Sequence, residues 1–366
     1  MKLRRSNGFL EAKRILARES SEIALLLGNG INRAADSSNG ISWDQLMERL
    51  ITSAAKNSPD PLATERRLKR LLEPGKSGRT AASLPEVFDI IEATRSVKPG
   101  GGTEPPTRFN LQSEIASMLK DMKPGAPHSA LVRWAAQFRI PLLTTNYDHC
   151  FQEALGEVTC KRRGFNRRRL HSDVYPWDRY YAPNIISDPA KEFAIWHVHG
   201  DRELERSIRA GLDQYMGMVE RLRKKKQLIA KEILRGPIEE RIDSPAFYDA
   251  PWLRVFMGKK LWIQGLALTP AEVSIRWLLI QRFRYWRRYK PECRFNTGWY
   301  VHGPTDLVGP LDKERGIFFE SVGLHVLAIA KTNNAYINLY RCGESATKQK
   351  RLIRNMTARV DAGLHA

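Results

Sequence analysis

The feature that most constrains how this chain folds is an unbroken apolar run at residues 23–27, which stops at the turn Gly28-Asn29-Gly30. Apolar residues without polar alternation predict a strand that is buried on both faces, as in a parallel sheet. Two glycines at the end of such a strand let the backbone approach a ligand where a Cβ atom would block it. The stretch therefore predicts a buried strand that leads into a ligand-binding turn.

The turn keeps a second interpretation, because Gly-x-Gly is also an ordinary tight turn. Ala34 and Ala35 stand where a third glycine would complete the G-x-G-x-x-G dinucleotide fingerprint. Ser42 and Gln45 have the spacing of a capping box, and the amphipathic run behind them predicts a helix. A strand, a glycine turn and a helix form the junction at which open α/β sheets bind nucleotides. The nucleotide interpretation thus needs partners elsewhere in the chain.

Further apolar runs alternate with helical patterns along the chain. The expected later strands are residues 140–145, 193–198, 260–268, 298–301 and 324–329. Helices are expected at residues 8–19 and 270–289, the second with Thr269 as its cap and Pro270 at its first position. This alternation favours an α/β fold, a Rossmann-like doubly wound parallel sheet with an inserted helical module.

The length of 366 residues allows one large domain with an insertion, or two domains. We expect residues 1–55 to begin the Rossmann-like domain and residues 56–125 to form the inserted helical module. Residues 126–335 would complete the domain, with a helical excursion at 203–257, and residues 336–366 would form a basic C-terminal tail.

The net charge of +20 is the strongest compositional fact. It predicts attraction to a polyanion, such as nucleic acid, a nucleotide or an acidic protein, although a basic protein can also lack such a partner. We expect no membrane span, no signal peptide and a cytoplasmic location, because long apolar segments are missing. The widely spaced Cys150, Cys160, Cys293 and Cys342 form no Cys-x-x-Cys pair, so free thiols are expected and no structural zinc is indicated.

Polar residues gather in three turns that a parallel sheet would bring to one edge: residues 28–33, 144–148 and 197–200. The first offers backbone N–H groups for a pyrophosphate, with Arg33 as a charged clamp. The second offers the amide of Asn146 and the carboxylate of Asp148. These groups suit ribose hydroxyls or a water molecule, unless they only close a turn.

The third turn carries an imidazole that could remove a proton from a sugar hydroxyl or from water. His197 and His199 alternate along a strand and should point to the same face, unless the strand bends at its end. His199 is favoured because it stands at the strand terminus. Its other interpretation is a hydrogen-bonded turn residue.

Taken in order, residues 28–32, 144–148 and 199–200 resemble the motifs of the sirtuin-like NAD-consuming superfamily. Residues 127–131, which include His128, are similar to the helix before the second motif of that family. Residues 265–268 with Glu272 are similar to its later glycine-bearing nucleotide turn. The resemblance therefore rests on an ordered set of motifs.

The resemblance, which spans residues 20–330, is closer to the bacterial branch found in anti-phage defence than to protein deacylases. Deacylases carry a Gly-Ala-Gly turn and two Cys-x-x-Cys pairs for zinc. This chain has Gly28-Asn29-Gly30 and no cysteine pair. These differences argue against acyl-lysine chemistry and leave NAD+ binding as an expectation.

The resemblance implies that NAD+ is hydrolysed to nicotinamide and ADP-ribose without a metal. Asn146 would hold a ribose hydroxyl or the attacking water, Asp148 would orient the nicotinamide ribose, and His199 would be the general base. The expected cofactor contacts are Gly28, Asn29, Gly30, Asn32, Arg33, Thr145, Gly200 and Gly265. The good leaving group makes positioning and electrostatic stabilisation the expected sources of catalysis.

The resemblance also implies a defence effector that depletes NAD+ and is switched through a homo-oligomer or a partner such as an ATPase or nuclease. Two rival functions remain: a non-catalytic nucleic-acid-binding or scaffold subunit, and a deacylase or ADP-ribosyltransferase. Residues 282–290 interleave cations with aromatics, which suits nucleic acid, or a helix with its aromatics inward and its arginines in solvent. The basic stretches 161–169 and 221–226 are expected to be loop or helix surface.

Overall fold

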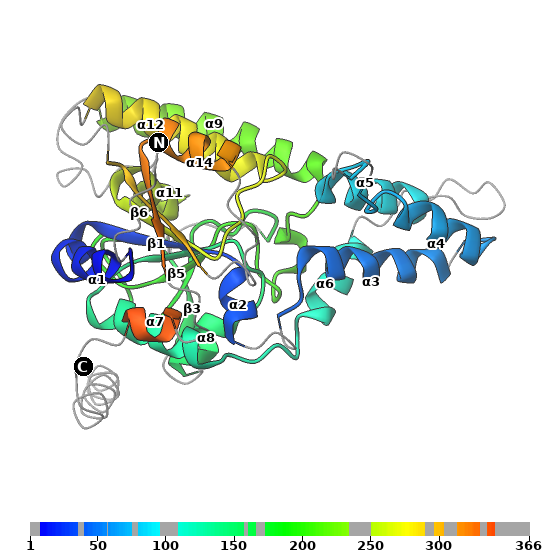
Figure 1. Cartoon of the computed structure of the whole chain (residues 1–366), viewed down its shortest axis with the longest axis horizontal. Helices are drawn as coiled ribbons and strands as arrows, with labels where there is room; N and C mark the ends of the chain where they lie inside the picture. Colours follow the sequence, from blue (N-terminus) through cyan, green and yellow to red (C-terminus); the bar gives the residue numbers. More distant parts are fainter. Residues whose placement is uncertain are drawn as a thin grey trace.

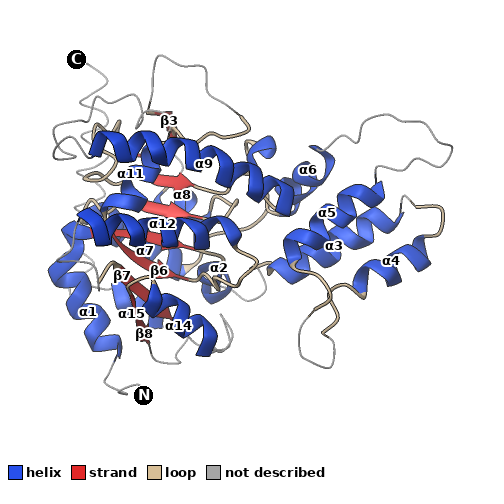
Figure 2. Ribbon diagram, turned by 90° about the horizontal axis from the view of Figure 1, so that it is seen from above, coloured by secondary structure: helices blue, strands red, loops and turns tan. Residues whose placement is uncertain are grey.

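A computed structural model describes residues 8–35, 40–56, 58–74, 80–95, 109–156, 160–165, 173–233, 250–289, 296–303, 313–329 and 335–340. These residues form one sheet covered by helices on both faces, and a group of helices that projects from one side of it (Figure 1, Figure 2). Within these residues, no helix has the length and apolar character needed to cross a membrane.

Six parallel strands form most of the sheet and reach one of its two edges. They are β1 (Ile23–Leu27), β2 (Leu142–Thr144), β5 (Ile195–His197), β6 (Lys260–Gln264), β7 (Gly298–His302) and β8 (Leu324–Ala328). Their order, β5-β2-β1-β6-β7-β8, matches the doubly wound order of dinucleotide-binding sheets. The predicted Rossmann-like α/β fold is confirmed. The chain moves outward from β1 in one direction and then resumes on its other side at β6, so the crossover point lies between β1 and β6.

The antiparallel edge of the sheet was not predicted. Strand β3 (Lys161–Gly164) pairs with β4 (Arg179–Ala182), and β4 pairs with β5 through Tyr181 and Ile195. Residues 161–164 had been expected in a loop or on a helix surface, because their charged side chains hide the usual strand pattern. An edge strand tolerates such charges, since its outer backbone and side chains face solvent.

Strand β1 shows how the two faces of the sheet are filled. Its alternate residues Ala24 and Leu26 join one hydrophobic cluster, and Ile23, Leu25 and Leu27 join the other. The first cluster is covered by α9 (Leu212–Ile233), α11 (Pro251–Gly258), α12 (Val273–Tyr289) and α14 (Lys313–Ser321). The second is covered by α1 (Gly8–Glu19), α2 (Gly30–Ala35), α7 (Ala126–Gln137), α8 (Cys150–Leu155) and α15 (Ala335–Tyr340). Two short 3-10 helices are η1 (Ser20–Glu22) and η2 (Glu205–Ser207).

The projecting helices have a hydrophobic cluster of their own (Figure 2). They are α3 (Trp43–Lys56), α4 (Pro61–Lys69), α5 (Leu84–Arg95) and α6 (Phe109–Met118). Helix α3, placed by the expected boundary at residue 55 in the sheet domain, packs in this cluster. Its predicted capping box is confirmed: Ser42 N–H donates to Gln45 Oε1 at 2.8 Å, and Gln45 N–H donates to Ser42 Oγ at 3.2 Å.

The expectation that the arginines of residues 282–290 face solvent is wrong for Arg282. This side chain is buried, and its guanidinium donates to Phe256 O at 2.8 Å and to Thr297 O at 2.6 Å. Burial lowers the pKa of Arg282 to about 9. Arg284 and Arg287 are exposed as expected. Arg282 therefore joins α12 to the last turn of α11 and to Thr297 before β7, because carbonyl groups in the last turn of a helix lack partners within that helix.

Several element boundaries also differ from expectation, and the strand expected at residues 260–268 ends at Gln264, before the turn at Gly265. Helix α12 begins at Val273 rather than at Pro270, because residues 269–272 close a turn in which Glu272 N–H donates to Thr269 O at 3.0 Å. The expected tail 336–366 begins as helix α15, whose Tyr336 and Tyr340 are buried in the core. The remainder of that tail lies outside the described part of the chain. The side chains of residues 224–226, in the basic stretch 221–226, also lie outside it.

Candidate functional site

A cavity of about 340 Å³ opens at the carboxyl ends of the strands, at the crossover point between β1 and β6. Of the residues predicted from the sequence, it is lined by Asn29, Gly30, Arg33, Thr145, Asn146, Asp148, His199 and Gly265. Gly28, Asn32 and Gly200 do not line it. The three predicted turns thus meet at one cavity, and three of the expected contact residues are not part of its lining.

Glycines allow the turns after β1 and β6 to touch. A Cβ atom on Gly28 would lie 2.5 Å from the Leu266 side chain, and one on Gly265 would lie 2.9 Å from Gly28 O. Gly265 also has a φ of +71°, which side-chain-bearing residues rarely adopt. Gly28 N–H donates to Gln264 O at 3.0 Å, and Gly30 N–H donates to Gly265 O at 2.8 Å. These two N–H groups already have partners, so the turn offers a ligand its close backbone, Asn29 and Arg33.

Asn32 is the hub of the polar residues behind the cavity wall, because it forms hydrogen bonds with several of them. The motif had predicted only that Asn32 lies near the cofactor. It is 2% exposed. Its Nδ2 donates to Asp148 Oδ2 at 2.7 Å and to Asn29 Oδ1 at 3.0 Å. Asn146 Nδ2 donates to Asn32 Oδ1 at 3.4 Å. The first and second turns are therefore joined through one buried side chain.

Asn32 also contacts His128, which was predicted to lie on a helix but was assigned no role. Gly125 N–H donates to His128 Nδ1 at 3.1 Å, so Nδ1 carries the lone pair and Nε2 carries the proton. That Nε2–H donates to Asn32 Oδ1 at 2.8 Å. Burial lowers the pKa of His128 to about 4, which keeps the ring neutral at pH 7. We call Asn32, His128, Asn146 and Asp148 the cavity cluster.

Asp148 has a structural and an electrostatic role. Its Oδ1 accepts from Cys150 N–H at 3.0 Å at the start of α8, and its Oδ2 accepts from Asn32. Burial acts to raise the pKa of Asp148, but these hydrogen bonds outweigh it and hold the pKa below the usual value. A carboxylate is thus kept ionised at the cavity wall, where it favours a developing positive charge.

His199 borders the cavity, whereas His197 does not. The His199 ring packs against Tyr215, with centroids 5.2 Å apart, and its Nε2 lies 3.0 Å from Ser274 Oγ. Burial lowers the pKa of His199 to about 3, so the ring is neutral at pH 7. Gly200, with a φ of +119°, turns the chain just after it, and a Cβ atom there would lie 2.4 Å from Ser207 O. Backbone geometry and packing, not a place in the cavity wall, explain this glycine.

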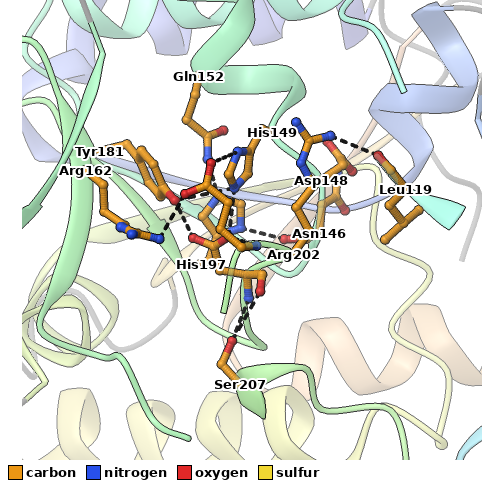
Figure 3. A network of polar contacts seen from close by, with 12 residues as sticks. Leu119, Asn146, Asp148, His149, Gln152, Arg162, Tyr181, His197, Arg202 and Ser207 are labelled. Carbon is orange, nitrogen blue, oxygen red and sulfur yellow. Dashed lines mark hydrogen bonds and ion pairs between the residues drawn. The ribbon is translucent and has the colours of Figure 1, made fainter. Parts of the chain in front are cut away.

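His197 belongs instead to a second polar group on the far side of the Asn146–Asp148 turn (Figure 3). We call His149, Gln152, Tyr181, His197 and Asp201 the inner cluster. Asp201 accepts from His149 Nε2 at 2.7 Å and from the Tyr181 hydroxyl at 2.5 Å. Burial alone would raise the pKa of Asp201, but the hydrogen bond from His149 leads the effects that hold it well below its usual value.

Glu272 lines the cavity and was absent from the predicted site. The residue keeps some exposed surface, but its Oε2 is buried and has no hydrogen-bond partner. Burial raises the pKa of Glu272 to about 7, against the opposing effects of the Leu268 N–H and of Arg276 and Arg315. Its only sequence signal is its place shortly after the Gly265 turn. A carboxyl group with a pKa near 7 can bind hydroxyls or an amide, or can exchange a proton at neutral pH.

The aromatic residues of the wall were also missed. Trp43 of α3 and Tyr147 line the cavity and meet edge to face, with ring centroids 5.9 Å apart. The helical module therefore supplies part of the wall opposite the sheet.

Searches of protein-family models and of curated proteins find no match to this chain.

Proposed function

We propose that this protein is a sirtuin-like NAD+ hydrolase that releases nicotinamide and ADP-ribose. The observation that carries the proposal is the cavity at the β1–β6 crossover, which gathers Asn146, Asp148 and His199 beside the Asn29–Arg33 turn. Doubly wound sheets bind nucleotides at this position. The cavity volume of about 340 Å³ lies near the lower end of the roughly 300–1,000 Å³ range of ligand pockets.

In this mechanism the bond between nicotinamide and ribose breaks, and its electron pair moves to the pyridinium nitrogen. Neutral nicotinamide leaves and a ribose cation develops, which the ionised Asp148 at the cavity wall stabilises. Water then attacks the anomeric carbon, and the neutral ring of His199 accepts its proton. The amide of Asn146 holds the water or a ribose hydroxyl.

The binding residues divide along the cavity. Asn29, Gly30 and Arg33 lie at the β1 turn and suit the pyrophosphate, because Arg33 supplies positive charge and Gly30 permits close approach. Thr145 and Gly265 border the same space from β2 and β6. Glu272 lies at the β6 side, where its carboxyl group suits hydroxyls of a ribose.

The proposed cellular role follows the same resemblance. NAD+ depletion in the cytoplasm would halt an infected cell, and activity would be switched by assembly of a homo-oligomer or by a partner protein such as an ATPase or nuclease. Trp43 and Leu46 of α3 and Leu84 of α5 place the helical module at the wall of the cavity. A change in how that module packs is therefore a direct route from a partner to the site.

The test is NAD+ consumption and nicotinamide release by the purified full chain, with wild type beside His199→Ala and Asn146→Ala. Loss of a general base or of a positioned amide should lower kcat/KM by about 10²–10⁴-fold. His325→Ala is the matched control, because His325 is exposed on β8, away from the cavity. Equal turnover by wild type and both cavity variants would contradict the assignment of these residues.

The net charge of +20 favours one other function, a nucleic-acid-binding or scaffold subunit without catalysis. Salt-dependent binding to DNA or RNA, together with unchanged NAD+ in the presence of a partner, would support it. Nicotinamide release only after addition of an acylated or acceptor protein would instead indicate a deacylase or ADP-ribosyltransferase.

A further inference from the structure

The inner cluster places three metal-binding side chains around one point. His149, His197 and Asp201 are all buried, and each offers a ligand atom within 4.8 Å of the other two. His149 follows β2 and His197 ends β5 (Figure 3). Asp201 lies in the loop that follows β5. The sheet therefore brings together ligands that are separated by about fifty positions along the chain, from 149 to 201.

The hydrogen bonds around the imidazoles leave the required nitrogens directed at this point. His197 Nδ1 lies 2.7 Å from Asn146 O, and a carbonyl can only accept, so Nδ1 carries the proton and Nε2 the lone pair. His149 Nδ1 lies 3.4 Å from Glu203 Oε1, while its Nε2 faces Asp201. An imidazole whose second nitrogen is held by a carbonyl or carboxylate is the usual arrangement around a bound metal.

The side chain of Gln152 is independent evidence for a ligand at this point. It is 4% exposed, and its Oε1 is buried without a partner. Its Nε2 lies 2.6 Å from His197 Nε2, so the amide lies directly against the cluster (Figure 3). Rotation of the amide by half a turn would direct the oxygen toward the same point as His197 Nε2.

We propose that the inner cluster is a Zn²⁺ site, with His149 Nε2, His197 Nε2 and an Asp201 oxygen as ligands and Gln152 Oε1 as the fourth. Two imidazoles and a carboxylate suit zinc, whereas calcium and magnesium prefer oxygen ligands. Tetrahedral zinc at about 2.1 Å from each ligand separates the ligand atoms by roughly 3.3 Å. As the ion enters, His149 Nε2 releases to solvent the proton that it donates to Asp201, and this 2.7 Å hydrogen bond opens.

The site would position the catalytic turn and would take no part in the reaction. His197 holds the backbone carbonyl of Asn146, and His149 directly follows Asp148. Zinc would fix both segments from behind the cavity wall. Local spacing does not reveal this site, because His149 lies far along the chain from His197 and Asp201. The proposal is independent of the proposed NAD+ chemistry, since zinc binding is measured without NAD+.

The test is titration of the chelator-treated full chain with Zn²⁺ by calorimetry, and with Co²⁺ by visible absorption. Wild type should bind one ion per chain, and the Co²⁺ form should show the intense bands of a tetrahedral site. His149→Gln and Asp201→Asn should each weaken Zn²⁺ binding by at least about 100-fold. Tyr181→Phe, which removes a hydrogen bond to Asp201, should weaken it by about tenfold. His325→Gln should bind like wild type.

X-ray absorption of zinc-loaded wild type keeps the proposal testable if the variants fail to fold. The spectrum should show a nitrogen and oxygen shell at about 2.0–2.1 Å with imidazole scattering. Three outcomes would overturn the proposal: wild type that binds no Zn²⁺, equal affinity in wild type, His149→Gln and Asp201→Asn, or a spectrum without imidazole scattering. In each case the cluster would be a closed hydrogen-bond network.

Discussion

The cavity cluster and the inner cluster lie on opposite sides of the same turn, Asn146–Asp148, and both are buried and contain histidine. The cavity cluster is organised by one side chain, since Asn32 contacts each of its other members. The inner cluster has no such hub. Asp201 contacts His149 and Tyr181, while His197 contacts Gln152 and the backbone.

The difference indicates different roles for similar residues. The cavity cluster holds one neutral imidazole and one ionised carboxylate at fixed positions beside an open space. The inner cluster directs imidazole nitrogens and a carboxylate at each other, and none of its residues lines the cavity described above. Buried polar groups that face a cavity can serve a ligand, whereas enclosed groups need partners from the protein or an ion.

The largest expected effect comes from removing the hub. Asn32→Ala leaves the Asp148 carboxylate and the His128 N–H buried without their partner, and should lower the free energy of unfolding by roughly 4 kcal/mol. Urea unfolding at pH 7 measures this. Asn184→Ala, at an exposed position, is the matched control. A loss no larger than that of the control would mean that Asn32 is not a hub. The cavity cluster, like the inner cluster, would then depend on no single side chain.

The pH dependence of Glu272 gives the next largest effect. The folded state raises the pKa of Glu272 from 4.5 to about 7, so it binds this proton more tightly than the unfolded state does. The resulting stabilisation is complete below pH 4.5 and is lost as the pH rises through about 7.

Between pH 4.5 and 8, the unfolding free energy of wild type should therefore fall by up to about 3 kcal/mol relative to that of Glu272→Gln. Urea unfolding of both proteins across this range measures the difference. Parallel pH profiles would contradict this prediction and show that solvent in the cavity hydrates the carboxyl group.

Removing one hydroxyl from the inner cluster should have a smaller effect. Tyr181→Phe deletes a single hydrogen bond to Asp201, which keeps its bond from His149, so the free energy of unfolding should fall by about 2 kcal/mol. The measurement belongs in chelator, so that metal binding does not contribute. A loss equal to that of Asn32→Ala would identify Asp201 and Tyr181 as a second hub.

The smallest effect is expected at the cavity rim, outside both clusters. Ser42→Ala removes the side-chain half of the capping box at the start of α3 and should lower the free energy of unfolding by about 1 kcal/mol. Thermal unfolding beside Asn184→Ala measures it. A loss comparable to that of Asn32→Ala would show that the helical module depends on the rim as strongly as the cavity depends on its hub.

Local patterns in the sequence were sufficient for much of the sheet and for the outline of the site. The apolar run at 23–27 is strand β1, and the Ser42–Gln45 spacing is a formed capping box. The turns at Gly28, Asn146 and His199 meet because carboxyl ends of parallel strands share an edge. Each of these inferences depends on residues close together in the chain.

Contacts between distant residues could not be predicted in this way. The Asn32–Asp148 hydrogen bond spans 116 positions, and no local spacing selects that partner. Arg282 looked like a surface cation, because its amide-carbonyl acceptors at Phe256 and Thr297 belong to other elements. The β3–β4 hairpin was hidden by its charges, and the raised pKa of Glu272 depends on burial that sequence does not display.

Local patterns in the sequence predict the alternation of strands and helices, the three polar turns and the residue types that each turn carries. The folded chain is needed to show that His199 borders the cavity while His197 joins the inner cluster. The physical reason is that strand β5 ends at His197, and alternation of side chains holds only inside a strand. Beyond it, the left-handed turn at Gly200 and the surrounding packing set where each imidazole lies.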